Sequence, residues 1–79
     1  RLYPNPVSDQ MTIDLHFASH QKLQMTIVDA QGRRFDRQKQ QGTELQISWG
    51  IQSLAAGSYW LHIQSEEGLL VIPFRKEGK

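Results

Sequence analysis

The sequence predicts an all-β fold, specifically a small antiparallel immunoglobulin-like β-sandwich of about six to seven strands. Apolar residues recur at every second position along most of the chain. Turn-forming residues interrupt this alternation roughly every 8–12 residues, and no stretch has the spacing of an amphipathic helix. The chain has 79 residues, enough for one domain, and no cysteine, so apolar packing must supply most of its stability.

Three strands are predicted in the first half of the chain. Apolar and polar residues alternate over residues 11–17 and again over 23–27. A turn is expected at Asp29-Ala30-Gln31-Gly32, with Asp and Gly at the first and last positions of a type I turn. Residues 33–40 can return as a third strand, whose only apolar anchor, Phe35, is expected to point inward.

The second half adds three strands, at residues 45–49, 59–63 and 70–74. Between the first two, residues 53–57 suggest one short helical turn that ends at Gly57. Residues 66–68 form a hairpin turn before the last strand. Pro73 cannot donate a hydrogen bond to a neighbouring strand, so this strand is expected at the edge of a sheet or with its proline nitrogen toward solvent.

Tyr59 stands at the start of a strand, directly after a tight corner. In immunoglobulin-like sandwiches a tyrosine in this place donates its hydroxyl to the backbone a few residues upstream, an arrangement called the tyrosine corner. The hydroxyl then satisfies a polar backbone group that burial would leave unpaired. The alternative is that Tyr59 is only a core aromatic residue.

Charge and hydropathy exclude two classes of partner. Nine basic and eight acidic residues give a net charge of +1, without the basic excess that nucleic acid binding requires. The longest apolar stretch, Leu69 to Ile72, is too short to insert in a membrane. The start at Arg1, directly before turn-forming residues, suggests a piece of a longer protein, so the lack of a signal peptide does not indicate the compartment.

No arrangement of residues points to catalysis, a metal or a cofactor. His16 and His20 would lie about 13 Å apart along a straight strand, and His62 belongs to another strand. Without cysteine a structural zinc site lacks its usual ligands, so solvated surface histidines are expected. The sequence has no nucleophile elbow and no glycine-rich phosphate loop. We therefore predict that the chain is not an enzyme.

Two surface features leave alternatives open. The basic run of Arg33, Arg34, Arg37 and Lys39 is expected to be a solvated edge strand that is protected by its charge, and a docking site for an acidic partner is the alternative. Trp60 alternates with core residues and should face outward. It is either a contact residue for a protein or carbohydrate partner or is covered by a neighbouring loop.

Four short motifs occur in an order that resembles a known family. They are Tyr3-Pro4-Asn5-Pro6-Val7-Ser8-Asp9, Val28-Asp29-Ala30-Gln31-Gly32-Arg33, Leu54-Ala55-Ala56-Gly57-Ser58-Tyr59-Trp60-Leu61 and the closing Phe74-Arg75-Lys76. Together they resemble the C-terminal sorting domain of cargo proteins of the type IX (Por) secretion system in Bacteroidetes-type bacteria. The resemblance covers nearly the whole chain.

The resemblance implies a non-catalytic secretion signal. Such a domain passes through the periplasm and directs an upstream cargo in the same chain to an outer-membrane translocon and its shuttle. A sortase-like peptidase then usually removes it, and the cargo is attached to the cell surface or released. The partners expected are therefore proteins, and the domain is expected to be a monomer, with strand exchange between copies left open.

The resemblance also implies which residues matter and how the chain is divided. The motif positions it implies are Pro4, Asn5, Pro6, Asp29, Gly32, Arg33, Leu54, Gly57, Tyr59 and Lys76, and maintenance of the fold is the alternative reason for these residues. A receptor is expected to contact the last strand, with Arg75 and Lys76, and the outward side chains beside it, and Trp60 is a further candidate contact. Residues 1–8 are expected as an extended N-terminal segment, 9–76 as the body of the sorting domain and 77–79 as a tail. The alternative function is an immunoglobulin-like accessory module of a secreted enzyme, for glycan binding or domain spacing.

Overall fold

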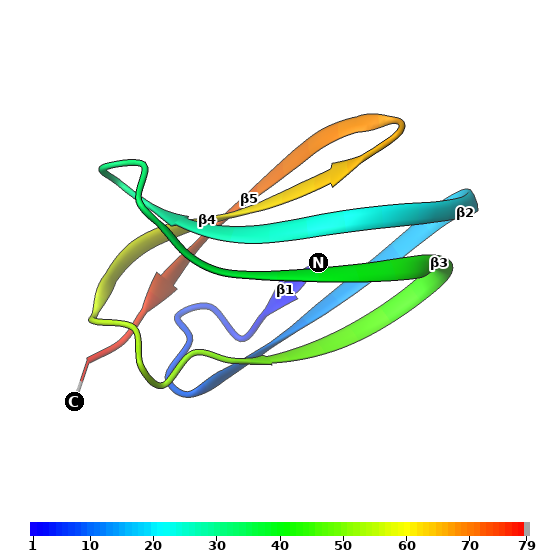
Figure 1. Ribbon diagram of the computed structural model, residues 1–79. Helices are drawn as coiled ribbons and strands as arrows, with labels where there is room; N and C mark the ends of the chain where they lie inside the picture. Colours follow the sequence, from blue (N-terminus) through cyan, green and yellow to red (C-terminus); the bar gives the residue numbers. More distant parts are fainter. Residues whose placement is uncertain (79) are drawn as a thin grey trace.

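A computed structural model describes residues 1–78 as one antiparallel sheet of five strands (Figure 1). The strands are β1 (Leu2–Tyr3), β2 (Gln10–Asp29), β3 (Arg34–Gly50), β4 (Gly57–Ser65) and β5 (Gly68–Lys76). The predicted all-β antiparallel class is confirmed. Within residues 1–78 no helix is long and apolar enough to cross a membrane.

The predicted number of strands is wrong, because the structure joins predicted strands that lie next to each other in the sequence. Strand β2 contains both strands predicted before the first turn, and β3 contains the next two. The polar residues between them bend the strands instead of ending them. The register shifts between His16 and Gln21, where residues 17–20 of β2 lie opposite Thr43 alone in β3.

The bend in β2 and β3 creates two layers from one sheet. The long β2–β3 hairpin folds back at its right-hand end in Figure 1, so that its two halves run in different layers. One layer contains β1 and the adjoining halves of β2 and β3. The other contains the remaining halves of β2 and β3, followed by β4 and β5.

Within residues 1–78 three strands of this sheet have only one neighbour, and one of them is the two-residue β1, which pairs with β2. Within the described residues β5 pairs only with β4, and β3 pairs only with β2. The edge position predicted for the strand with Pro73 is therefore confirmed. The edge position of the basic run is confirmed as well, because Arg34, Arg37 and Lys39 all belong to β3.

The core lies between the two layers and is formed by the alternating apolar residues of the strands and by side chains of the connections. Its buried members are Val7, Met11, Ile13, Leu15, Leu23, Met25, Ile27, Ile47, Trp49, Ile51, Leu54, Tyr59, Leu61, Ile63 and Phe74. The inward orientation predicted for Phe35 holds in part, because its ring meets the buried Tyr59 ring edge to face while 44% of the residue is exposed. A register shift between Ile27 and Val28 interrupts the alternation opposite Phe35.

The predicted helical turn at residues 53–57 is also wrong. The chain instead makes a tight turn in which the Leu54 N–H donates to the Ile51 carbonyl over 3.1 Å. The side chains of Ile51 and Leu54 are both buried. These two side chains therefore cover one end of the core. Their burial stabilises the segment, although it forms no helix.

The first eight residues pack against the body. Leu2 and Tyr3 pair with Ile13 and Thr12 of β2, and Val7 is fully buried. The peptide bonds before Pro4 and Pro6 are both cis. Of the predicted tail, Glu77 donates its N–H to the Val7 carbonyl over 2.7 Å, and Lys79 lies outside the described residues.

Candidate functional site

The sequence motifs, far apart along the chain, meet at one end of the molecule. Asp29 of β2 pairs with Tyr59 of β4, and Tyr59 pairs with Phe74 of β5. Lys76 pairs with Gly57 on one side and bridges to Val7 on the other. In Figure 1 the turn after β2, the start of β4 and the end of β5 all lie on the left. We call this group of motif residues the motif end.

The central motif forms the turn between β2 and β3. The Gly32 N–H donates to the Asp29 carbonyl over 3.0 Å, which confirms a β-turn from Asp29 to Gly32. Gly32 has φ +82°, a conformation that other residues rarely adopt. Asp29 Oδ1 accepts the N–H groups of Gln31 and Arg33 at 2.9 and 2.8 Å.

The Asp29 carboxylate is held in its charged form. Burial acts to raise the pKa of Asp29. This effect is outweighed by the backbone and side-chain hydrogen bonds from Arg33, by the hydrogen bond from the Gln31 N–H and by the charge of Arg33, which all lower the pKa. Arg33 Nε donates to Asp29 Oδ2 over 2.8 Å. The pKa of Asp29 therefore lies below its ordinary value of 3.8.

We expect Asp29 to make the domain sensitive to acid. Because the pKa of Asp29 is lower in the folded state, its stabilising contribution is complete above pH 3.8 and is lost as the pH falls through the folded pKa. Asp29→Asn should lower the urea concentration at the midpoint of unfolding at pH 7. In this variant the midpoint should also fall less steeply than in the parent as the pH drops from about 5 to 2. Asp9→Asn, at an exposed carboxylate, is the control and should leave both unchanged.

Tyr59 forms the predicted tyrosine corner. Its hydroxyl donates to the Ala55 carbonyl over 2.6 Å, four residues upstream, so the prediction is confirmed. The buried ring stacks on Phe74 and meets Phe35 edge to face, both with centroids 5.7 Å apart. Gly57 takes φ +154° two residues earlier, as this corner requires.

The N-terminal motif is fastened to the C-terminal strand. Asn5 Oδ1 accepts the Arg75 N–H over 3.1 Å, and the Val7 N–H donates to the Arg75 carbonyl over 2.7 Å. Within the closing motif Arg75 is exposed, but Lys76 is only 7% exposed and donates its Nζ to the Glu77 carbonyl. Only Arg75 of this pair is thus accessible to a partner.

The structure adds an exposed apolar surface on β5, in a run that the sequence shows but whose exposure was not predicted. Leu69, Leu70 and Val71 are 54%, 47% and 42% exposed. Their run is apolar on both faces of the strand, a pattern typical of strands that are buried on both sides. Because β5 is an edge strand within the described residues, these residues have β4 on one side and no partner strand on the other. The unbroken apolar run was the signal that could have revealed it.

Trp60 lies on the outer face, as its place in the alternation predicts, but it is half-buried rather than exposed. Its direct cross-strand neighbours are Val28 of β2 and Pro73 of β5. Trp60 is therefore a component of the sheet surface next to β5.

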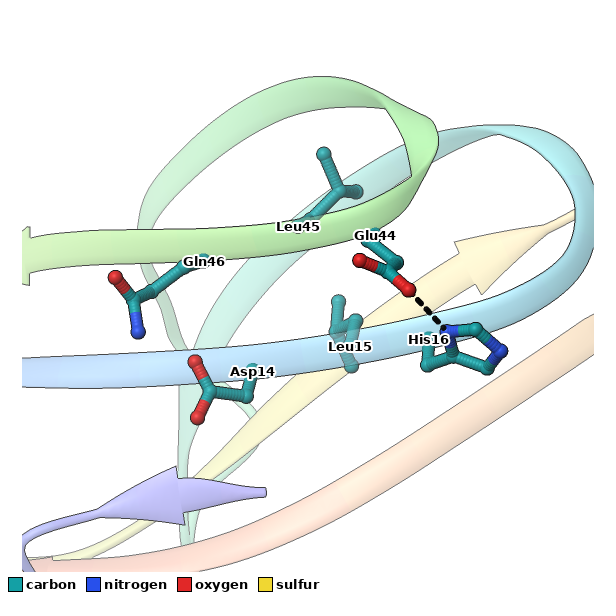
Figure 2. A pocket seen from close by; sticks show the side chains of 6 residues that line it. All are labelled: Asp14, Leu15, His16, Glu44, Leu45 and Gln46. Carbon is teal, nitrogen blue, oxygen red and sulfur yellow. Dashed lines mark ion pairs between the residues drawn. The ribbon is translucent and has the colours of Figure 1, made fainter.

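The histidines do not form a common site. His16 Nδ1 lies 3.3 Å from Glu44 Oε1, with both side chains exposed, and His20 contacts Gln41. Figure 2 shows the His16–Glu44 pair on neighbouring strands, together with Asp14, Leu15, Leu45 and Gln46. These six residues line a shallow pocket of about 540 Å³. Among the described residues no group of three or more His, Asp or Glu side chains is placed to hold a metal ion.

The comparisons with known proteins agree with the motifs. A family described as the secretion system C-terminal sorting domain, the type IX (Por) family, matches residues 1–73. The match includes the first three motifs and ends before Arg75 and Lys76. No curated protein and no solved structure matches the chain. With more than nine-tenths of its length matched, this chain belongs to the family of secretion system C-terminal sorting domains.

Proposed function

We propose that this domain directs an upstream cargo through the type IX outer-membrane translocon, and that protein receptors recognise its strand β5. Membership of the sorting-domain family supports a role as a secretion signal. We infer the place of receptor recognition from the exposed apolar side chains of Leu69, Leu70 and Val71 on an edge strand. Exposed apolar side chains in a cluster are typical of protein interaction sites.

The edge of β5 also offers backbone groups to a partner. A partner strand added to this edge would gain main-chain hydrogen bonds, and the leucine and valine side chains would supply apolar contact. Pairing with β4 over residues 68–76 holds the whole of β5 in place, and the contacts of Asn5 and Val7 with residues 75–77 fasten the end away from the apolar surface. A receptor would therefore meet a strand whose conformation is already fixed, which lowers the entropic cost of binding.

The later steps of the proposal follow from the family. Residues 1–79 act as one sorting domain without catalysis of their own, in transit through the periplasm and then at the cell surface. A sortase-like peptidase removes the domain, and the cargo is attached to the surface or released. The two layers and the tyrosine corner also support an immunoglobulin-like description of the fold.

An export assay tests this proposal. Residues 1–79 are fused behind an inert periplasmic reporter in cells with a type IX system, and the domain should bring the reporter to the cell surface. Leu69→Lys with Val71→Lys should retain most of the reporter in the periplasm, because two charges replace the exposed apolar side chains. Both residues are exposed, so circular dichroism of the purified double variant should match the parent.

A matched control uses the edge strand β3. Thr43→Lys with Ser48→Lys adds the same two charges at exposed positions of β3 and should be exported normally. Normal export of the β5 variant would refute recognition through this strand. Failure of the parent fusion to reach the surface would refute the export function itself.

A further inference from the structure

The edge strand β3 carries a group of cationic side chains on the outer face of the sheet. Leu23, Met25 and Ile27 of β2 are buried, so the residues that alternate with them face outward. In the register of β2 with β3, Gln24 lies opposite Lys39, Thr26 opposite Arg37 and Val28 opposite Arg34. Lys22 shares this face and lies opposite Gln41. We call Lys22, Arg34, Arg37 and Lys39 the basic strip.

No acidic side chain occupies the paired positions of this face. Strand β4 contributes Trp60, His62 and Gln64, and β5 contributes Leu69, Val71 and Pro73. Asp36 stands next to Arg37 in the sequence but belongs to the opposite face, where its Oδ2 accepts the Trp49 Nε1–H over 2.8 Å. Within residues 1–78 no member of the basic strip forms an ion pair. The strip therefore has a positive field that no neighbour on this face offsets.

Two shallow hollows adjoin the strip and contain hydrogen-bond donors. One, of about 240 Å³, is lined by Gln24, Arg37, Gln38 and Lys39. The other, of about 230 Å³, has Arg34, Arg37 and Gln64 among its lining residues. Guanidinium and amide N–H groups side by side suit carboxylates, which accept two hydrogen bonds in a fork.

The spacing of the cations matches an extended peptide. Arg37 and Lys39 are two residues apart on one strand, about 6.6 Å, and carboxylates at alternate positions of an extended peptide have the same repeat. The edge of β3 that faces away from β2 has no partner strand within the described residues. A segment added there would place its alternate side chains directly opposite Arg37 and Lys39.

We propose that the basic strip binds an acidic segment of another protein in extended conformation, with Asp or Glu at every second position, added along β3. Cationic side chains on an edge hinder the addition of ordinary strands. For a segment with carboxylates in register, the same charges become attractive, so the edge selects its partner by charge. This interaction goes beyond the proposed export role and does not depend on recognition of β5.

Binding of a defined peptide to the 79-residue chain tests the proposal. The probe is a fluorescently labelled peptide of four Glu-Thr repeats, with four Gln-Thr repeats as the uncharged comparison, and anisotropy gives the affinity. Only the Glu-Thr peptide should bind, and its affinity should fall at least tenfold between 50 and 500 mM NaCl because salt screens exposed charges. Arg37→Gln with Lys39→Gln should weaken binding at least fivefold.

The control is matched in net charge. Thr43→Glu with Ser48→Glu lowers the net charge by two, as the Gln double variant does, but changes the other half of β3. Its affinity should stay within twofold of the parent. Equal weakening by both double variants, or no binding of the Glu-Thr peptide at 50 mM NaCl, would overturn the proposal. Strip-dependent binding to anionic phosphatidylglycerol vesicles without peptide binding would also overturn it, in favour of a membrane surface.

Discussion

Val7→Asp is expected to unfold the domain. Val7 is fully buried in the core, and both its backbone groups hold the end of β5 through the Arg75 carbonyl and the Glu77 N–H. A carboxylate at this site would be buried without a partner, and we expect a loss of about 4 kcal/mol or more in the free energy of unfolding. A domain of 79 residues has only about 4–12 kcal/mol in total.

Urea unfolding followed by tryptophan fluorescence measures this loss. Ser8→Asp is the matched control, because it introduces the same charge at the adjacent exposed position and should change stability by no more than about 0.5 kcal/mol. Similar stability of the two variants would show that the N-terminal segment is not part of the folded body. Unfolding by Val7→Asp alone would show that the first and last segments stabilise each other.

Tyr59 should show the second largest effect. Tyr59→Ala removes a buried ring that packs on Phe74 and Phe35, and it should cost about 3–5 kcal/mol of unfolding free energy. Tyr59→Phe keeps the ring but removes the hydroxyl that donates to the Ala55 carbonyl. The carbonyl is then left without its donor, and we expect a loss of about 1–3 kcal/mol.

The two Tyr59 variants together separate packing from hydrogen bonding. The free energy of unfolding of both variants is measured with urea at pH 7. The difference between the Phe and Ala variants gives the contribution of the ring, and the difference between the parent and the Phe variant gives the contribution of the hydroxyl. Phe74→Leu is a useful comparison, because it reduces the same aromatic cluster without touching the hydroxyl. A Tyr59→Phe variant as stable as the parent would mean that the corner contributes nothing to stability.

Much of the local structure could be predicted from residue order alone. The period-two alternation identified the strand regions, because the side chains of a strand point alternately to its two faces. Asp29 and Gly32 indicated their turn and Tyr59 its corner, since each depends on the chemistry of a few adjacent residues. Pro73 likewise placed β5 at an edge, because proline lacks the N–H that an inner strand needs.

Long-range contacts decided the rest. Whether the polar residues near His20 and Gly42 end a strand or bend it depends on the partner strand, so the strands were counted wrongly. The burial of Val7 and Lys76 arises from a bridge between residues 69 positions apart, which no local pattern records. The exposure of Leu69 to Val71 also depends on which strands lie beside β5. The sequence by itself thus determined the strand regions, the turn at Asp29 to Gly32 and the family. Only the tertiary structure decided how many strands form, which motif residues meet and which side chains face outward, because burial depends on neighbours that are distant in the chain.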